Sequence, residues 1–285
     1  MLSLRELKED LDFNMELGDL LKVMQTIAVF KFRSVQQKRQ RFELFVRILS
    51  EFLGTVDFSD TPVYFVSPKS ERTAIIVVTS DEGFTGGLNM LVIEKALSYD
   101  QREDTCFVVV GSRGWSYFRE VNKQCVYFKR VNKDDNYRLA VELRDFVIDG
   151  VRSAKFGRVM VVYPMLVSFV IQRPEMVGLL PLSDTSSFSS EGKDRVDVGS
   201  GVIVESPLEG IVGYLVEIFV LEKLVEILDE SRLSEFAARA IHLEKSEREL
   251  EELRTQIRFR YFRAYHERID RSIRELFSSQ ILLRK

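Results

Sequence analysis

The chain has 285 residues, of which 45% are apolar and 30% are charged, and its net charge at pH 7 is −3. This composition excludes a disordered chain and allows one large domain or two small ones with a true hydrophobic core. The near balance of 41 basic and 44 acidic residues gives no overall reason to expect binding to nucleic acid. The sequence contains no run of about 18 apolar residues, so direct membrane insertion is not expected and any membrane role would come through partners.

The N-terminal segment, residues 1–53, carries a helical pattern that only Gly18 interrupts. Apolar side chains recur mostly three, four or seven positions apart, and charged residues fill the other positions, as in an amphipathic helix. This stripe consists of Leu7, Leu11, Leu17, Leu21, Met24, Ala28, Phe32 and Val35, and it continues through Phe42, Phe45, Val46 and Leu49. The sequence therefore predicts a long helix whose apolar face needs a partner.

The middle of the chain has the pattern of a small α/β domain. Short apolar, β-branched runs at 74–80, 106–111 and 158–163 predict strands that are covered on both faces. Helical patterns at 89–99 and 136–153 lie between them. Strands that alternate with helices of this length favour a mainly parallel sheet. Residues 183–200 are rich in Ser, Asp and Gly and predict a loop or a poorly ordered hairpin.

The C-terminal segment contains no glycine or proline from Tyr214 to Lys285, a span of 72 residues. Interior glycine costs a helix about 1 kcal/mol and interior proline about 3 kcal/mol, so this span favours one continuous helix. At 1.5 Å per residue the helix would be roughly 100 Å long, which requires a partner along its length. Its apolar stripe is made of Leu243, Leu250, Leu253, Ile257, Tyr261, Tyr265, Ile269, Ile273 and Leu276.

The two ends can bury each other's apolar stripes, which predicts an antiparallel intramolecular coiled coil with irregular pairing. The expected fold class is α/β, with this long coiled coil flanking a small, mainly parallel Rossmann-like domain. The expected parts are residues 1–56 as the N-terminal helix of a shaft, 57–207 as the globular domain, and 208–285 as the C-terminal helix of the shaft.

A glycine-rich loop follows the first predicted strand, where a phosphate-binding loop could lie. The spacing of Gly83, Gly86 and Gly87 fits neither G-x-G-x-x-G nor G-x-x-x-x-G-K-[ST], so a tight strand-to-helix turn is the better interpretation. Asp81, at the end of the strand, could be a metal ligand or a general base. No second carboxylate or histidine is spaced to join it, so a capping or turn role is expected instead.

The other reactive side chains form no catalytic set. Cys106 and Cys125 fit neither a metal spacing nor a disulfide framework, and they are expected to be ordinary residues with apolar surroundings. His242 and His266 lie 24 residues apart in the predicted helix, too far to share a metal. Because no Ser-His-Asp or Cys-His arrangement can be assembled, neither an active site nor a cofactor is predicted.

One charge pattern stands out in the C-terminal helix, where residues 254–274 carry seven arginines against Glu267 and Asp270. A solvated helix face would have this composition. The alternative is a basic surface that meets acidic partner groups, because the planar guanidinium group binds carboxylates with two parallel hydrogen bonds. This arginine-rich segment contains Arg254, Arg258, Arg260, Arg263, Arg268, Arg271 and Arg274.

Four stretches of the sequence resemble motifs of the gamma subunit of F-type ATP synthases. K-V-M-Q-T-I-A-V-F-K at 22–31 is similar to the family's K-A-M-K-M-V-A-A-x-K, and T-S-D-E-G-F-T-G-G-L-N at 79–89 is similar to T-S-D-R-G-L-C-G-G-L-N. L-L-P-L at 179–182 and S-E-F-A-A-R at 234–239 match L-L-P-L and S-E-x-A-A-R. The glycine-rich and S-E-x-A-A-R motifs are the specific ones, and all four occur in the family's order.

The resemblance implies a mechanical role. In this family the terminal helices form a coiled coil inside a hexamer of alternating alpha and beta subunits, and the globular domain rests on a membrane ring of c subunits. Rotation of the shaft couples ion flow through the ring to ATP synthesis or hydrolysis in the hexamer, where ATP is bound. The resemblance further implies an epsilon subunit as a partner, and a peripheral location on the cytoplasmic face of the inner (plasma) membrane.

The resemblance also implies contact residues. Contacts with the acidic lever loop of beta are expected from Lys22, Met24, Asp81, Glu82, Gly86 and Gly87. Shaft and hexamer contacts are expected from Arg239, Arg254, Arg258, Arg263, His266, Arg268 and Asp270.

The chain departs from the family at two of these places. Glu82 stands where the family motif has arginine, which reverses a charge that would face an acidic loop. Near the end of the C-terminal helix, the family's R-Q-A-A-I-T-Q-E becomes Y-H-E-R-I-D-R-S at 265–272, so His266 and Asp270 replace polar residues that meet the hexamer's catch loop. These departures predict a divergent member with co-varied partners.

The residues alone leave two other functions open. A coiled-coil scaffold or interaction protein with an α/β head would have the same helical ends, and a Rossmann-like enzyme with helical arms would have the same sheet. Neighbouring genes for alpha and beta subunits would favour the rotor, whereas nucleotide binding to the isolated chain would favour the enzyme.

Overall fold

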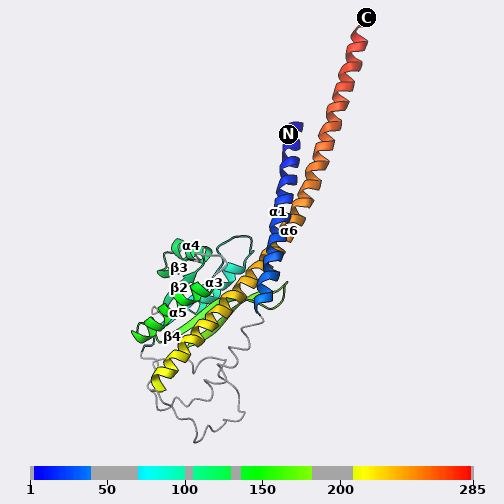
Figure 1. Ribbon diagram of the computed structural model, residues 1–285. Helices are drawn as coiled ribbons and strands as arrows, with labels where there is room; N and C mark the ends of the chain where they lie inside the picture. The colour runs from blue at the N-terminus through cyan, green and yellow to red at the C-terminus, as the bar shows by residue number, and fades with distance from the viewer. Residues whose placement is uncertain (1–2, 40–69, 100–104, 130–135, 182–207, 284–285) are drawn as a thin grey trace. The chain divides into compact units, whose positions relative to one another are not determined.

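The computed structural model describes residues 3–39, 70–99, 105–129, 136–181 and 208–283 (Figure 1). The chain divides into two compact units, which we call the coiled-coil unit (Met1–Ala28 with Ala240–Lys285) and the α/β unit (Val29–Arg239). Helix α1 (Leu4–Arg39) and helix α6 (Leu208–Leu283) each contribute residues to both units.

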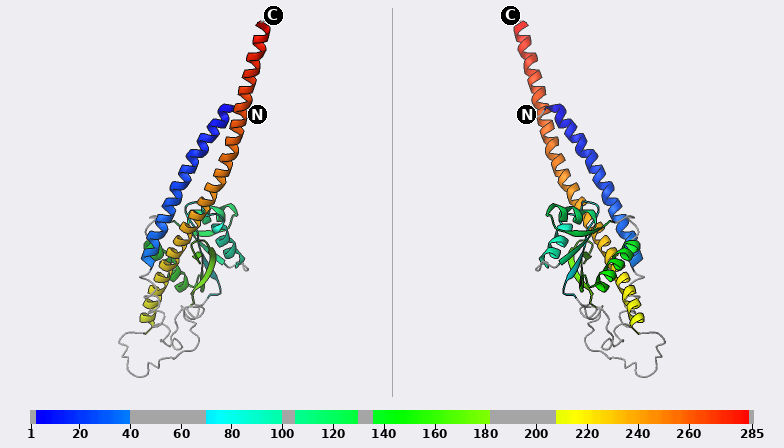
Figure 2. Two further views of the ribbon diagram at one scale, coloured as in Figure 1. Left: turned by 90° about the vertical axis from the view of Figure 1, so that its right-hand side faces the viewer. Right: turned by 90° about the vertical axis from the view of Figure 1, so that its left-hand side faces the viewer.

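In the coiled-coil unit, α1 and α6 lie side by side and run in opposite directions (Figure 1, Figure 2). Leu7, Leu21 and Ala28 of α1 are buried, as are Leu243 and Ile257 of α6. These residues belong to the two predicted stripes, and the predicted antiparallel coiled coil is therefore confirmed. The expectation that the whole α6 stripe is buried was wrong, because α1 covers only part of it. Five of its members are exposed: Leu253, Tyr265, Ile269, Ile273 and Leu276.

Gly18, the one interruption of the N-terminal pattern, lies opposite Leu250 of α6. A Cβ atom added to Gly18 would be 3.6 Å from Cδ2 of Leu250, an ordinary packing distance. The buried Asn14 on the same side of α1 donates a hydrogen bond from Nδ2 to the Asp10 carbonyl at 2.7 Å. An alanine would therefore also fit at position 18, and the polar Asn14 is satisfied within its own helix.

The α/β unit is built around a five-stranded sheet with the order β3-β2-β1-β4-β5. The strands are β1 (Thr73–Val78), β2 (Thr105–Val110), β3 (Cys125–Phe128), β4 (Arg158–Leu166) and β5 (Gln172–Leu180). The first four are parallel, and β5 pairs antiparallel with β4. This confirms the mainly parallel sheet and the three predicted strands. Strand β3 was missed because its apolar run, Cys-Val-Tyr-Phe, is only four residues long. Strand β5 was missed because it begins with Gln-Arg-Pro-Glu.

Helices cover both faces of this sheet (Figure 1). They are α3 (Leu88–Ser98), α4 (Ser112–Glu120), α5 (Asn136–Arg152) and the first part of α6. Alternate residues of β1 serve the two faces: Ile75 and Val77 pack with α3 and α4, whereas Ile76 and its neighbours pack with α5 and α6. Helices α3 and α5 confirm the predictions at 89–99 and 136–153. Helix α4 was not predicted, because it has nine residues and contains a glycine.

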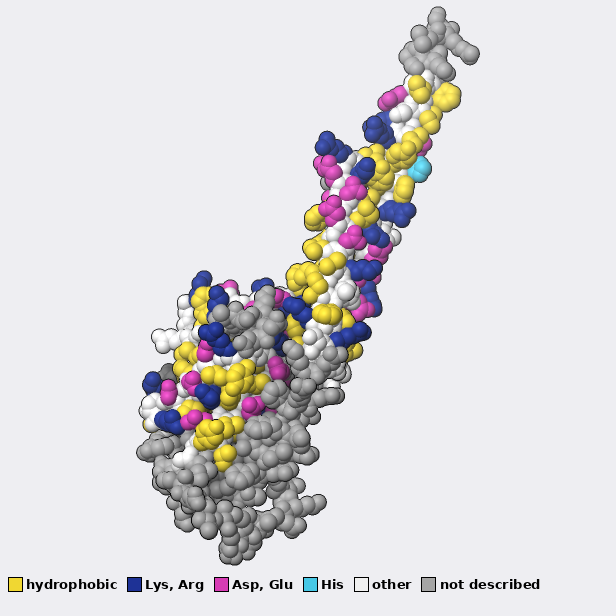
Figure 3. Space-filling view, viewed as in Figure 1, with side chains coloured by type: hydrophobic (Ala, Val, Ile, Leu, Met, Phe, Trp, Pro, Cys, Tyr) yellow, Lys and Arg dark blue, Asp and Glu magenta, His cyan; other side chains and the backbone are white. Residues whose placement is uncertain are grey.

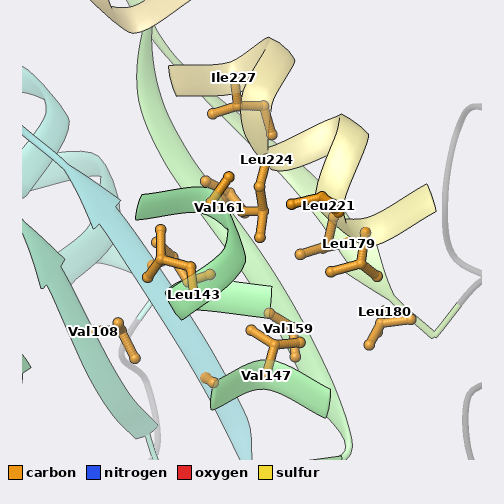
Figure 4. Close-up of a cluster of buried hydrophobic side chains, with 14 of the residues drawn as sticks. Val108, Leu143, Val147, Val159, Val161, Leu179, Leu180, Leu221, Leu224 and Ile227 are labelled. Atoms are coloured by element: carbon orange, nitrogen blue, oxygen red, sulfur yellow. The ribbon is translucent and has the colours of Figure 1, made fainter. Parts of the chain in front are cut away.

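The first part of α6 is a component of the hydrophobic core. Leu221, Leu224 and Ile227 pack against Val161 of β4 and Leu179 of β5 (Figure 4). The long C-terminal helix is thus part of the α/β unit before it enters the coiled coil. The predicted limits at 56/57 and 207/208, the stripe from Phe42 to Leu49 and the loop at 183–200 fall on residues outside the described ranges, so they stay predictions.

We expect Leu224→Ala to lower the free energy of unfolding by about 2–5 kcal/mol, because the substitution removes buried methyl groups and leaves a cavity in the core. Urea denaturation of the purified chain measures this change. The matched control is Leu276→Ala on the same helix, where the side chain is exposed and the effect should stay within about 0.5 kcal/mol. Equal effects of the two substitutions would contradict a core role for this part of α6.

Candidate functional site

The loop between β1 and α3, residues 79–87, is held by hydrogen bonds from its own side chains. The Thr79 hydroxyl donates to the Val110 carbonyl at 2.8 Å and accepts from the Gly114 amide at 3.0 Å. Asn89 of α3 accepts at Oδ1 from the Ser80 amide at 3.0 Å and donates from Nδ2 to the Ser80 hydroxyl at 2.8 Å. Gly86 has a φ of 60°, which glycine adopts without strain. The predicted tight turn is confirmed.

Two glycines of the next connection allow this loop to touch α4. A Cβ atom on Gly111, whose φ is 94°, would lie 2.1 Å from the Thr79 carbonyl oxygen. A Cβ atom on Gly114 would lie 2.6 Å from Oγ1 of the same threonine. Neither site can hold a larger residue without movement of the backbone, so the loop and the start of α4 form one packed unit.

Asp81 caps the N-terminal end of α4. Its Oδ1 accepts a hydrogen bond from the Ser112 amide at 2.9 Å, and its carbonyl accepts from the Ser112 hydroxyl at 2.9 Å. A carboxylate is favourable at this end of a helix because the free amide groups carry partial positive charge. The predicted capping or turn role is confirmed, although the capped helix is α4 and not the adjacent α3. Among the described residues no cluster of His, Cys, Asp and Glu could hold a metal ion.

Arg239 of α6 reaches the same loop from a buried position. Its side chain is 7% exposed, and Nε donates a hydrogen bond to the Gly83 carbonyl at 3.1 Å. Nη1 lies 3.6 Å from Oε2 of Glu82, and the guanidinium carbon lies 5.6 Å from the centre of the Phe236 ring. The structure thus brings two of the predicted site residues, Glu82 and Arg239, together within this chain. Sequence reasoning missed the pair, although the acidic residue in place of the family's arginine was the available signal.

A small aromatic cluster surrounds this part of α6. Phe32 of α1 packs with Leu233, Phe236 and Ala237, and its ring meets that of Phe169 edge-on with centres 5.0 Å apart. Lys31 lies 5.7 Å from the centre of the Phe236 ring. We call this group, together with Arg239 and residues 82–83, the α6 socket. All of its members belong to the α/β unit.

The predicted site residues on α1 lie in the coiled-coil unit. Lys22 is exposed and Met24 is half-buried. Their neighbours form a feature that sequence reasoning did not identify, because the helix has a second apolar stripe outside its buried face. The members of this outer stripe are exposed and consist of Phe13, Leu20, Val23, Ile27 and Phe30.

The arginine-rich segment forms several local pairs along α6. Arg254 contacts Glu251 at 2.6 Å, and Arg263 contacts Glu267 at 3.2 Å. Arg274 donates from Nε to the Asp270 carbonyl at 3.2 Å. Such exposed pairs are worth only a few tenths of a kcal/mol, about 0.3–0.5. These pairs support the solvated-face interpretation for their members, while the predicted partner contacts of Arg258, His266 and Arg268, which are also exposed, stay predictions.

The same part of α6 exposes large apolar side chains. They lie along the C-terminal part of α6, which continues beyond the first residues of α1 (Figure 2, Figure 3). Phe259 is 71% exposed, although it lies on a helix whose other face is paired. A contiguous apolar surface of this kind marks an interaction site. The exposed members are Phe259, Phe262, Tyr265, Ile269, Ile273, Leu276 and Phe277.

Four titratable groups of the α/β unit are perturbed by burial, and one of them is the Tyr127 phenol, whose pKa burial raises. Burial raises the pKa of the Cys106 and Cys125 thiols, and both cysteines are free. Burial also raises the pKa of Glu222 in α6. Within the described residues, Oε2 of Glu222 is buried and has no hydrogen-bond partner. The thiols are therefore poor nucleophiles, and the charged form of Glu222 destabilises the fold.

We expect Glu222→Gln to raise the free energy of unfolding at pH 7, because it removes a desolvated negative charge. The folded state holds the Glu222 proton more tightly than the unfolded state, so this residue's contribution to stability is present below its ordinary pKa of 4.5 and is lost as the pH rises through the raised value. The gain should therefore shrink as the pH falls below 4.5. Urea denaturation at several pH values measures it.

The matched control is Glu226→Gln on the same helix. Glu226 is paired with Lys223 at 2.8 Å, so its replacement should give no gain at pH 7. A gain for Glu222→Gln that is independent of pH would contradict the assignment of the effect to the buried carboxylate.

Comparisons with known proteins agree over nearly the whole chain. A family model described as ATP synthase matches residues 3–280. The ATP synthase gamma chain of Syntrophobacter fumaroxidans is 25% identical over 100% of both chains, and that of Symbiobacterium thermophilum is 27% identical over 90% of each. A chain of the Euglena gracilis mitochondrial ATP synthase, in its OSCP/F1/c-ring structure, matches with a TM-score of 0.70 at 15% identity and covers 98% of this chain and 94% of that one. The structural likeness supports the fold alone.

None of the helices in the described ranges combines the length and the apolar character that crossing a bilayer requires.

Proposed function

This chain belongs to the ATP synthase gamma-chain family, and we propose that it is the non-catalytic rotor shaft of an F-type ATP synthase. The observation that carries the proposal is the continuity of α6, whose 76 residues form core contacts with the sheet in one unit and pair with α1 in the other. As a subunit of the complex, the chain transmits rotation, and its alpha and beta partners bind and convert ATP.

The mechanical argument follows from the helix itself. A helix of this length extends about 114 Å at 1.5 Å per residue, and its internal hydrogen bonds connect each turn to the next. Pairing with α1 along one side opposes bending of α6. Rotation of the sheet and its helices is therefore passed along α6 to the exposed apolar end.

The partners follow from the family and from the surfaces that the chain leaves exposed. We propose that the exposed end of α6 and the outer stripe of α1 meet the alpha and beta subunits, because both surfaces are apolar and lie on the paired helices. The α/β unit is the part proposed to meet the epsilon subunit and the ring of c subunits. The complex is membrane-associated and the chain is peripheral in it; we place it on the cytoplasmic face of the plasma membrane.

The glycine-rich loop supports a contact with beta through part of its residues. Asp81 is occupied by its capping role, whereas Glu82, Gly86 and Gly87 are exposed. Phe84 is also exposed and has a φ of 62°, which places a large apolar side chain on a turn that would strain most residues. Glu82 is paired with Arg239 at 3.6 Å, so the proposed contact with the lever loop of beta uses Phe84, Gly86 and Gly87 more than the two acidic residues.

Reconstitution with the alpha and beta subunits of the same organism tests the proposal. The expected result is a complex whose ATP hydrolysis drives rotation of a bead attached to the α/β unit of this chain. Failure of the chain to assemble with those subunits would contradict the rotor and favour the scaffold alternative. Nucleotide binding to the isolated chain would favour the enzyme alternative.

We expect Arg258→Glu combined with Arg268→Glu to weaken coupling to the hexamer without affecting folding, because both side chains are exposed in the isolated chain. The free energy of unfolding of the chain should change by no more than about 0.5–1 kcal/mol. ATP hydrolysis and rotation of the assembled complex measure the coupling. Arg138→Glu on α5, also an exposed arginine, is the charge control. Unchanged assembly and ATP hydrolysis in the double variant would rule out a coupling role for these arginines.

A further inference from the structure

We propose that Glu82 and Arg239 are positioning residues that fix the rotational position of α6 in the α/β unit. Arg239 is the last residue of that unit, and α6 continues from Ala240 into the coiled coil. The contact is therefore made at the point where the helix leaves the sheet domain. The role of this contact in transmitting rotation rests on the proposed rotor function, but the contact between Glu82 and Arg239 itself does not.

The apolar part of the α6 socket cannot set this position by itself. Leu233, Phe236 and Ala237 pack against Phe32 without directional bonds. Hydrophobic burial depends on the area removed from water and is almost insensitive to direction. The Phe32 cluster therefore opposes separation of α6 more than rotation about its own axis. Resistance to rotation comes from the core packing of Val216–Leu228 further along the helix and, at the socket, from polar contacts.

The polar part of the socket is directional. Arg239 donates to the Gly83 carbonyl at 3.1 Å while its Nη1 lies 3.6 Å from Glu82, so two different groups of one loop bind one guanidinium. Neighbouring residues of a helix are about 100° apart, so a shift of one position would carry Arg239 away from both partners. Because its side chain is 7% exposed, the charge would then be left buried without its partners, which is strongly unfavourable.

The loop is itself anchored, so the contact transmits force to the sheet. Asp81, one residue before Glu82, caps α4, and Ser80 is bonded to Asn89 of α3. A Cβ atom on Gly83 would lie 2.8 Å from Nη2 of Arg113, so glycine leaves room for a second arginine beside the loop. The bond from Arg239 thus connects α6 to the loop that α3 and α4 both hold.

This arrangement belongs to the particular sequence of the chain. The family motif has arginine where Glu82 stands. A second guanidinium at that position would lie about 4 Å from Arg239 and would repel it. The acidic residue instead supplies the opposite charge. Arg239 is thus a partner within the chain that explains why position 82 is acidic. This explanation does not depend on which subunit the loop contacts.

The first experiment is a double-mutant cycle on the purified chain, with Glu82→Gln, Arg239→Gln and the combined variant. The two residues should be coupled. The change in the unfolding equilibrium constant of the combined variant should differ about threefold or more from the product of the changes in the two single variants. The exposed pair Arg138 and Glu142 on α5 is the matched control and should show about twofold coupling or less. Additive effects of Glu82→Gln and Arg239→Gln would overturn the proposal.

The second experiment measures ions pumped per ATP hydrolysed by the whole complex in sealed vesicles. Glu82→Gln should lower this ratio about twofold or more relative to the unsubstituted complex, and Arg138→Gln should leave it unchanged. Because Glu82 is 44% exposed, its replacement should not prevent folding. Glu82→Asp, which keeps the negative charge beside Arg239, should retain more of the ratio than Glu82→Gln, which a merely destabilised variant would not do.

The outcomes separate the two proposals. A complex with the unsubstituted chain that pumps no ions contradicts the proposed rotor function, and the cycle on the isolated chain still decides the contact. Normal pumping by the unsubstituted complex together with an unchanged ratio in Glu82→Gln contradicts the positioning role alone.

Discussion

The structure depends on α6 burying its apolar side chains against two different partners. From Val216 to Leu228 it packs on the sheet, and from Leu243 to Ile257 it packs on α1. A single helix can serve both only if nothing interrupts it between the two contacts, and no glycine or proline occurs after Gly213. The absence of helix breakers is therefore a requirement of the fold, because each break would separate the core of one unit from the pairing of the other.

The sequence predicted the elements whose stability is local or whose burial is complete. The continuous β-branched runs of β1, β2 and β4 are buried on both faces of a parallel sheet, where no alternation is needed. Helix α4 and strand β3 escaped prediction because tertiary contacts hold them. Trp115 of α4 stacks on Tyr127 of β3 with ring centres 5.1 Å apart, and Arg119 lies over the same indole. Short elements such as these take their conformation from such neighbours more than from intrinsic propensity.

In the candidate site, too, the sequence predicted local features and missed contacts between distant parts of the chain. Motifs located the glycine-rich loop and the arginine of S-E-F-A-A-R, but they did not reveal that the two meet, because 156 residues separate Gly83 from Arg239. Asp81 could be assigned a capping role from its position at the strand end, yet the capped helix was one that the sequence had not revealed. The outer stripe of α1 was missed for another reason. Apolar periodicity located the face that the chain buries, and it does not tell that a second set of apolar positions stays exposed.

Under the proposed function, the two exposed apolar surfaces would supply much of the free energy of assembly. The outer stripe of α1 and the end of α6 bear large side chains that the chain itself does not cover. Burying such surface is worth about 25 cal/mol per Å², so a partner that encloses both would stabilise the paired helices as well as bind them. The apolar side chains of such a shaft become buried only when its partner encloses them. The shaft can still turn inside the partner, because hydrophobic contact resists separation but has no preferred direction. Directional polar contacts are then needed elsewhere, and the structure provides one at the α6 socket, where rotation must be transmitted.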